Sequence, residues 1–320
     1  MTAEFMLDAA NLLRTANSFL LVSHVRPDGD AVGSLLGLGS ALQNSGKRIQ
    51  MVLADGVPAQ FRHLPGCEAV LHRPEGDFDV ICLVDCSDGG RVGVQLPGNK
   101  IPDINIDHHI TNLSFARINL VDTAAVATAE ILAELIPLSG LLIDLNVAAT
   151  LLTGIITDTI GFQTNNMTPK ALRLAALLMG AGANISDLYR KALSNRSYEA
   201  IHFWGAGLSR VERDDRMIWT TLTMEDRKQA KYPGRDDADL INVLTSVDNA
   251  DIYMIFVEQP KGKVKVSWRS QIGFDVTGVA SRFGGGGHPS ASGAEIRGDL
   301  SEVKNTVLSA TRNFFSVHKD

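Results

Sequence analysis

Apolar residues in the first half of the chain follow two alternating patterns. Helical spacing of apolar positions predicts amphipathic helices, and short continuous apolar runs predict buried strands. The expected helices lie near residues 3–17, 31–45, 124–136 and 146–156, and the expected strands near residues 19–23, 48–53, 80–84 and 103–106. Strands that are apolar throughout and alternate with helices are typical of a parallel sheet covered on both faces, so we expect an α/β fold.

The second half has a different pattern, in which strands follow one another closely. Two runs at residues 252–258 and 263–269 flank the turn Gln259-Pro260-Lys261-Gly262 and predict an antiparallel hairpin. A further strand is expected near residues 216–221, and helices near residues 236–245, 275–282 and 301–314. We therefore expect an α/β domain over residues 1–188, a helical connector over residues 189–211 and a smaller α+β domain over residues 212–320.

Residues of the types that commonly bind metals follow four apolar runs of the first domain. They are His24, Asp28 and Asp30 after the first run, Asp85 after the run at 80–84, Asp107, His108 and His109 after the run at 104–106, and Asp158 after the run at 151–157. We treat the last run as a fourth strand end, although it overlaps the helix expected near residues 146–156. The carboxyl ends of parallel strands meet at one edge of a sheet, so we expect these side chains to lie together.

One aspartate at a strand end is more often a turn former or a helix cap than a ligand. Five carboxylates at one edge, however, repel one another unless cations neutralise them, which favours a pair of divalent metal ions. Imidazole together with carboxylate suits Mn²⁺, Fe²⁺, Co²⁺ or Zn²⁺, whereas Mg²⁺ prefers oxygen ligands alone. Two-metal sites of this kind serve the displacement of phosphoryl groups.

Composition and charge limit the partners and the compartment. The chain has 320 residues, 45% of them hydrophobic, and its formal net charge of −6 is unfavourable for binding long duplex nucleic acid. Three cysteines without paired spacing fit a reducing compartment. Neither a signal peptide nor a membrane span is apparent, so we expect a cytoplasmic protein that does not bind membranes.

The ordered motifs resemble those of a known superfamily. His24-x-x-x-Asp28-x-Asp30, Asp85, Asp107-His108-His109 and Asp158 are similar to the motifs of the DHH phosphoesterases. Arg269-Ser270 and the run Gly284-Gly285-Gly286-Gly287-His288 are similar to the DHHA1 substrate domain. Within the superfamily, the length and the C-terminal motifs look most like the group of nanoRNases and pAp phosphatases. The resemblance implies a DHH-type parallel-sheet catalytic domain followed by a DHHA1-type substrate domain.

The resemblance also implies a role for each of these residues. His24 and Asp28 would bind one metal ion, Asp30, His108 and Asp158 a second, and Asp85 both. His109 would face the scissile phosphate, and Asp107 would orient a ligand histidine. A terminal phosphate of the substrate would be bound by Arg269, Ser270, His288 and the backbone of Gly285, Gly286 and Gly287.

Two further features lie outside these motifs, and each has two interpretations. Arg91 would contact the substrate or form a salt bridge. Lys261, Lys263 and Lys265 would form a solvated strand face or a weak phosphate-tracking surface beside Arg269.

These roles predict a metal-dependent phosphoesterase with two divalent cations. We expect the cations to be Mn²⁺, with Mg²⁺ and Co²⁺ as alternatives. A bridging hydroxide would attack the phosphorus of a short oligoribonucleotide or of pAp in a cleft between the domains. A phosphodiesterase for pApA or cyclic di-AMP and a non-catalytic nucleotide-binding module are the alternatives. An inorganic pyrophosphatase fits less well, because its C-terminal domain lacks the Gly-rich His loop.

Some exposed apolar residues would allow a homodimer. Two divalent cations would move the formal net charge from −6 to −2, so the acidity does not exclude a short phosphate-ended ligand.

Overall fold

The computed structural model describes residues 3–271 and 273–316. The chain forms two compact units, Met1–Asn195 and Arg196–Asp320. No helix in the described ranges is both long enough and apolar enough to cross a membrane.

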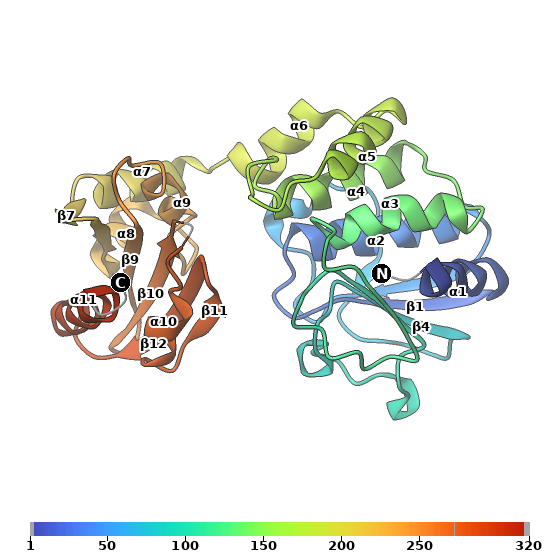
Figure 1. Ribbon diagram of the computed structural model, residues 1–320, viewed down its shortest axis with the longest axis horizontal. Coiled ribbons are helices and arrows are strands. Elements are labelled where there is room, and N and C mark those ends of the chain that lie inside the picture. The colour runs from blue at the N-terminus through green and yellow to red at the C-terminus, as the bar shows by residue number, and fades with distance from the viewer. Residues whose placement is uncertain (1–2, 272, 317–320) are drawn as a thin grey trace. The chain divides into compact units, whose positions relative to one another are not determined.

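The first unit is built on a six-stranded parallel sheet (Figure 1). Its strands are β1 (Ser18–Val22), β2 (Arg48–Val52), β3 (Val70–Leu71), β4 (Val80–Val84), β5 (Ile104–Asp107) and β6 (Ile118–Val121). They lie in the order β3-β2-β1-β4-β5-β6, and each pairs in parallel with its neighbours. The chain order runs outward in both directions from β1 and β4, so the carboxyl ends of these two strands form the point where α/β sheets bind ligands.

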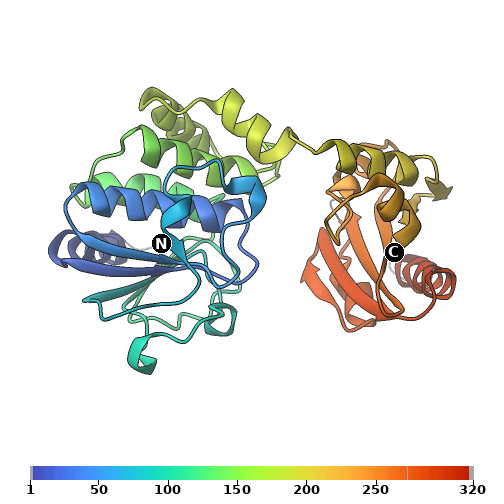
Figure 2. The same ribbon diagram turned by 180° about the vertical axis from the view of Figure 1, so that it is seen from behind.

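Helices cover one face of this sheet, and irregular segments cover the other (Figures 1 and 2). The helices are α1 (Ala3–Thr15), α2 (Gly29–Asn44), α3 (Thr128–Leu138), α4 (Leu145–Asp158), α5 (Pro169–Gly180) and α6 (Ile185–Tyr189). On the opposite face, Val92 and Phe115 pack against Leu20 and Ile81. Short 3-10 turns lie at Ala59–Phe61, Cys67–Ala69, Gly89–Arg91 and Pro97–Asn99. The expected parallel sheet is confirmed, with helices on a single face.

A row of glycines allows α2 and α4 to approach closely. Gly29, Gly33 and Gly37 recur every fourth residue of α2 and face α4. A Cβ atom on Gly33 would lie 2.5 Å from the carbonyl oxygen of Thr150, and one on Gly29 would lie 2.3 Å from the hydroxyl of Thr157. Because any side chain would collide there, these glycines set the distance between the two helices.

The second unit is built on a six-stranded mixed sheet. Its strands are β7 (Glu212–Asp214), β8 (Met217–Leu222), β9 (Ile252–Gln259), β10 (Lys263–Ser270), β11 (Gly286–His288) and β12 (Ala291–Arg297), in the order β11-β12-β10-β9-β8-β7. Strands β8 and β9 are parallel, and the other pairs are antiparallel. The expected hairpin is present as β9 and β10, which pair in register along their whole length.

Helices cover both faces of this second sheet. They are α7 (Tyr198–Leu208), α8 (Met224–Ala230), α9 (Leu240–Leu244), α10 (Thr277–Ser281) and α11 (Leu300–Ser316). Phe203 of α7 and the residues of α9 pack with Tyr253 and Ile255 of β9. Helices α10 and α11 pack with Met254 of β9 and Trp268 of β10 on the other face. The alternation along β9 shows that successive residues face opposite layers.

Three features differ from the sequence-based expectations. Asp158 is the last residue of α4 rather than the residue after a strand, since the apolar run before it is buried as a helix. Gly286 and Gly287 belong to the edge strand β11, because their backbones pair with β12. The region expected as a connector holds a π-helical turn at Arg190–Ser194 and α7, and α7 packs in the second unit.

Candidate metal centre

The first candidate ligands lie between β1 and α2. Strand β1 ends at Val22, and His24 follows two residues later with a buried side chain. Asp28 caps α2 by accepting a hydrogen bond from the backbone N–H of Ala31 at 3.1 Å. Asp30 lies in the first turn of α2 and is buried. The helix start therefore places one histidine and two carboxylates above the carboxyl end of the central strand.

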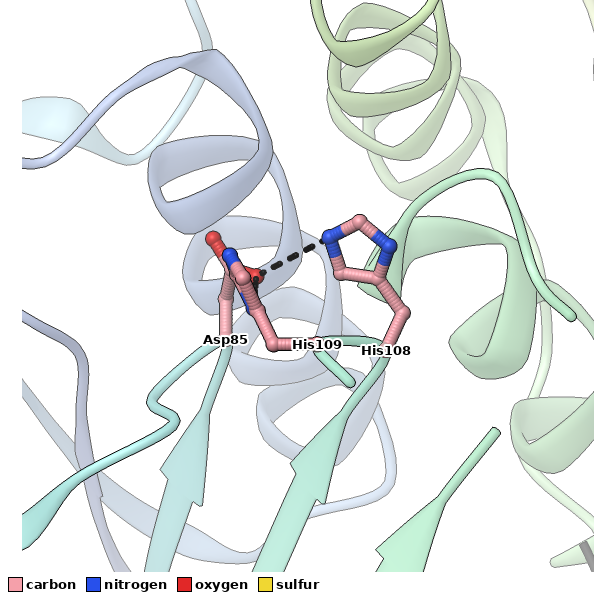
Figure 3. Close-up of side chains that lie close together, drawn as sticks. All are labelled: Asp85, His108 and His109. Atoms are coloured by element: carbon pink, nitrogen blue, oxygen red, sulfur yellow. Dashed lines mark ion pairs between the residues drawn. The ribbon is translucent and has the colours of Figure 1, made fainter. Parts of the chain in front are cut away.

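Asp85 and two histidines come from the ends of the neighbouring strands (Figure 3). Asp85 follows β4 and is buried, and its φ of 56° lies in the left-handed region. His108 and His109 follow β5, and both rings lie beside the Asp85 carboxylate, with Nε2 of His108 3.8 Å and Nδ1 of His109 3.6 Å from its Oδ1. A positive φ is strained for most residues but is tolerated comparatively well by Asp and Asn. The turn after β4 thus aims this carboxylate at the histidines.

The donor atoms form two groups that share Asp85. In one group, Nε2 of His24 lies 3.5 Å from Oδ2 of Asp85 and 3.8 Å from Oδ2 of Asp28. In the other, Nε2 of His108 lies 3.8 Å from Oδ1 of Asp85, 3.9 Å from Asp30 and 3.4 Å from Asp158. Ligands that share an ion at about 2.1 Å lie roughly 3–3.5 Å apart. Each oxygen of Asp85 therefore faces a different group of potential ligands.

Hydrogen bonds to the backbone orient His24 and His108, the two candidate ligand histidines. Nδ1 of His24 lies 2.8 Å from the carbonyl oxygen of Val25, and Nδ1 of His108 lies 3.4 Å from that of Ala125. A carbonyl oxygen only accepts, so the proton belongs on Nδ1 in each ring, and Nε2 keeps its lone pair. Those lone pairs face the carboxylates, which is the orientation that metal binding requires.

The electrostatics of the donor set favour cations. Burial and the nearby charge of Asp85 raise the pKa of Asp30 above its usual range and the pKa of Asp158 to about 8. Burial also acts to raise the pKa of Asp85, but the neighbouring histidines His24, His108 and His109 lower it to about 2. The site therefore holds more carboxylates than its histidines can neutralise.

The residues present fit a pair of divalent metal ions. Three groups of side chains each bring their donor atoms within 4.8 Å of one another. They are His24–Asp28–Asp85, Asp30–His108–Asp158 and Asp85–His108–His109. In the part of the chain that the structure describes, these four aspartates form ion pairs with histidines and with no lysine or arginine. Mixed imidazole and carboxylate ligands suit Mn²⁺, Fe²⁺, Co²⁺ and Zn²⁺.

Asp107 contacts His109 rather than the ring of a ligand histidine. Its Oδ1 lies 2.7 Å from Nδ1 of His109, and its Oδ2 accepts a hydrogen bond from Asn112 at 2.5 Å. Burial opposes the charge of His109, but the bond to Asp107 and the charge of Asp85 raise its pKa to about 9. The carboxylate thus keeps the proton on Nδ1 and leaves Nε2–H of a charged ring free to donate.

Sequence reasoning missed Thr128, which contacts two of the candidate ligands. Its hydroxyl donates to Oδ1 of Asp85 at 3.0 Å, and its backbone N–H donates to Asp30 at 2.6 Å. Ala129 N–H and the Ser34 hydroxyl also donate to Asp30. The sequence shows a threonine at a helix start, but nothing in it shows that α3 begins against this carboxylate.

Arg91 lies beside His24, with Nη2 3.2 Å from Nδ1 of that ring. Since Nδ1 carries a proton in the tautomer that bonds Val25, this approach is not a hydrogen bond. Within the described residues Arg91 forms no salt bridge, and its contact with a substrate stays a prediction.

The candidate phosphate-binding residues of the second unit lie at the ends of β10 and β11. Burial lowers the pKa of Arg269, and its Nη1 donates to the carbonyl of Trp268 at 3.0 Å. The Ser270 hydroxyl donates to carbonyl oxygens of Phe274 and Pro289, so its proton is used within the loop. The backbone of His288 pairs with β12, and its side chain lies outside the described part of the structure.

The three glycines expected to bind phosphate differ in their surroundings. A Cβ atom on Gly285 or Gly287 would collide with the backbone of β12, at 2.2 Å and 2.4 Å from carbonyl oxygens. No atom would lie within 4 Å of a Cβ on Gly286. The first two therefore serve close strand pairing, and Gly286 offers the open backbone that an anion could approach.

Family comparisons agree with this combination of folds and side chains. The model of the N-terminal domain of the DHH family matches residues 18–155, and that of the DHHA1 domain matches residues 224–316. The chain belongs to the DHH phosphoesterase family.

Individual relatives place the chain more narrowly. It is 36% identical over 298 residues to the bifunctional oligoribonuclease and PAP phosphatase NrnA of Thermus thermophilus, covering 91% of this chain and 88% of that protein. The Bacillus subtilis protein of the same name is 27% identical over 294 residues, which are 89% of this chain and 92% of that protein. The crystal structure of an exopolyphosphatase-related protein from Bacteroides fragilis superposes with a TM-score of 0.90 at 26% identity, covering 99% of this chain and 98% of the other.

Proposed function

We propose that this protein hydrolyses short oligoribonucleotides and pAp with two divalent metal ions, of which Mn²⁺ is the preferred one. The observation that carries the proposal is the pair of ligand groups that share Asp85, with each carboxylate oxygen facing one group. The names of the Thermus thermophilus and Bacillus subtilis relatives, oligoribonuclease and PAP phosphatase, support this choice of substrates.

The side chains of the first unit divide the binding of the two ions between them. His24 and Asp28 would hold one ion, Asp30, His108 and Asp158 would hold the other, and Asp85 would contribute to both. When bound there, two divalent cations would supply neutralisation of the charge on the phosphoryl oxygens and would lower the pKa of a nucleophilic water. Thr128 fixes the rotamer of Asp85 and thereby the place of both ligand groups.

His109 and Arg269 act on the substrate phosphates. The charged ring of His109, oriented by Asp107, donates Nε2–H to a non-bridging oxygen of the scissile phosphate. Arg269 pairs with a second phosphate, either the further phosphate of pAp or the next group of an oligonucleotide. The open backbone of Gly286 assists this contact. Two phosphates per substrate are common to pAp and to a 5′-phosphorylated dinucleotide, which accounts for activity on both.

Substitution of Asp85 by Asn tests the proposal. Asn tolerates the positive φ at this position, so the variant removes the charge without straining the backbone. With Mn²⁺, the wild type is expected to hydrolyse a diribonucleotide and pAp, and EDTA to abolish both activities. Loss of a hydrogen-bond partner of a metal ligand lowers activity by up to about a hundredfold. Asp85 is itself a proposed ligand, so Asp85→Asn should lower kcat by more than that. The matched control is Asp77→Asn, at an exposed position outside the site.

The substrate panel also contains pApA and cyclic di-AMP. Because pApA is itself a 5′-phosphorylated diribonucleotide, turnover of cyclic di-AMP or pApA without turnover of pAp or of diribonucleotides of other sequence would show that the substrate assignment is wrong. Wild-type hydrolysis of the diribonucleotide by Asp85→Asn would contradict the metal-dependent mechanism. Nucleotide binding without turnover in Mn²⁺, Mg²⁺ and Co²⁺ would identify a binding module instead.

A further inference from the structure

The second unit contains a groove that cations line on most sides. One part has a volume of about 440 Å³ and is lined by Arg227, Lys228, Lys231 and Arg235. The adjoining part, of about 530 Å³, is lined by Arg235 again and by Lys261, Lys263 and Lys265. Because Arg235 and Pro260 line both parts, the two form one continuous surface, which we call the basic groove.

Most cations of the basic groove have no carboxylate partner. Lys263 pairs with Glu295. The carboxylate of Asp236 instead accepts hydrogen bonds from the Tyr232 hydroxyl and from Ala238 N–H. Over the ranges 3–271 and 273–316, no ion pair is formed by Arg227, Lys228, Lys231, Arg235, Lys261 or Lys265. The second unit has 17 basic and 17 acidic residues, so this excess of positive charge is local.

Arg227 adds a guanidinium to the wall of the basic groove. Its Nε and Nη2 atoms are buried and have no hydrogen-bond partner in the described part of the chain, although its guanidinium lies over the ring of Phe203. Burial lowers the pKa of this arginine, which means that its charge is poorly compensated. These two nitrogens lie beneath the surface, so the rest of the side chain is the part of Arg227 that lines the groove, held over the buried ring of Phe203.

The groove continues toward Arg269 on the same face of β10. Val264, Val266 and Trp268 point into the core, so the alternating residues Lys263, Lys265 and Arg269 share the opposite face. Lys265 and Arg269 are four residues apart, which is roughly 13 Å along an extended strand. A phosphate in the groove would thus lie on the same surface as the phosphate expected at Arg269.

We propose that the basic groove binds a phosphate group of a nucleotide or oligonucleotide, separately from the phosphate site at Arg269. Guanidinium groups pair with phosphate through two parallel N–H bonds, and two arginines, Arg227 and Arg235, line the groove. The surrounding lysines add the long-range attraction that a multiply charged ligand requires. Only the choice of nucleotides as ligands rests on the proposed function.

Binding measurements on the full-length protein test this inference. Fluorescence anisotropy in EDTA would follow labelled oligoribonucleotides of two and seven residues, and displacement would report pAp. The groove variant is Lys228→Ala with Arg235→Ala, both exposed side chains. The control, Arg213→Ala with Lys304→Ala, removes the same charge from residues that do not line the groove. Arg227→Met is a further variant that removes the buried donors.

The groove variant is expected to bind the heptaribonucleotide about tenfold more weakly, while the control stays within about twofold of the wild type. The slope of log affinity against log salt concentration should fall by about 0.7, since one phosphate contact on a single strand contributes about that much. A loss confined to the heptamer identifies an oligonucleotide as the source of the phosphate. An equal loss for pAp identifies a free nucleotide.

Equal affinities of the groove and control variants for all three probes would overturn the inference. Thermal unfolding of each variant shows whether it is folded, and the exposed pair keeps the test valid if Arg227→Met does not fold. The assay needs no hydrolysis. A failure of the proposed function would appear separately, as missing Mn²⁺-dependent turnover by the wild type.

Discussion

Asp85 combines a buried carboxylate with a backbone in the left-handed region, and both features follow from its place after β4. The sequence predicted this residue, because an aspartate after an apolar run is visible in one dimension. It could not predict Thr128, whose hydroxyl reaches Asp85 across 43 positions of the chain. Contacts between distant segments carry no local signal, so the outer partners of ligands are the residues that sequence reasoning misses.

Thr128 provides a test at this scale. Thr128→Val removes the hydroxyl and should weaken Mn²⁺ binding by about 10–100-fold, because Asp85 loses the donor that fixes its rotamer. Thr128→Ser keeps the donor and should stay within a few-fold of the wild type. Isothermal titration of metal-free protein with Mn²⁺ measures the affinity.

A buried threonine of the second unit supplies the control for this prediction. Thr220 donates its hydroxyl to the carbonyl of Gly207, so Thr220→Val removes a comparable hydrogen bond away from the metal centre. It should lower the unfolding temperature without changing Mn²⁺ affinity. Equal Mn²⁺ affinity of Thr128→Val and the wild type would show that Thr128 does not position the carboxylate.

At the scale of the elements, helix packing decides where Asp158 lies. The apolar run before it was expected to end a strand, but it forms the buried part of α4, which packs on α2 through Gly29 and Gly33. The periodicity of a short apolar run does not separate a buried strand from a buried helix. Strand β12 was not predicted for a different reason. Its sequence, ASGAEIR, has few large apolar residues.

Gly33→Ala tests the role of the close contact between α2 and α4. The added methyl group would lie 2.5 Å from the Thr150 carbonyl, so the helices must separate. We expect a loss of about 2–4 kcal/mol in the free energy of unfolding. Mn²⁺ affinity should fall as well, because Asp30 and Asp158 move apart. Chemical unfolding and Mn²⁺ titration measure the two effects.

Gly180→Ala is the matched control, since Gly180 ends α5 and no atom lies within 4 Å of its added Cβ. That variant should be neutral or slightly more stable, as alanine is the better helix former. Wild-type stability and Mn²⁺ affinity in Gly33→Ala would contradict the account of helix spacing.

For the whole molecule, the charge divides unevenly between the two units. The first unit has 13 basic and 19 acidic residues, and the second has 17 of each, so the net charge of −6 lies entirely in the first. Composition alone suggested an acidic protein. The structure shows that the acidity is concentrated in the unit with the candidate metal ligands, and that the second unit gathers unpaired cations in the basic groove.

This division predicts how metal removal affects stability. All the candidate ligands lie between residues 24 and 158, so Mn²⁺ should stabilise the first unit alone. At a concentration one hundred times the dissociation constant, each ion adds about 2.7 kcal/mol. Differential scanning calorimetry of the metal-free and Mn²⁺-loaded protein should show one transition that shifts upward and one that stays. A shift of both transitions, or of neither, would contradict the assignment.

The central claim is that two metal ions bind on either side of Asp85. Anomalous diffraction at the manganese absorption edge, from crystals soaked in Mn²⁺, tests it most directly. The account predicts two peaks, one beside His24 and Asp28 and one beside Asp30, His108 and Asp158, each within coordination distance of a different oxygen of Asp85. A single peak, or peaks that do not share Asp85, would contradict it.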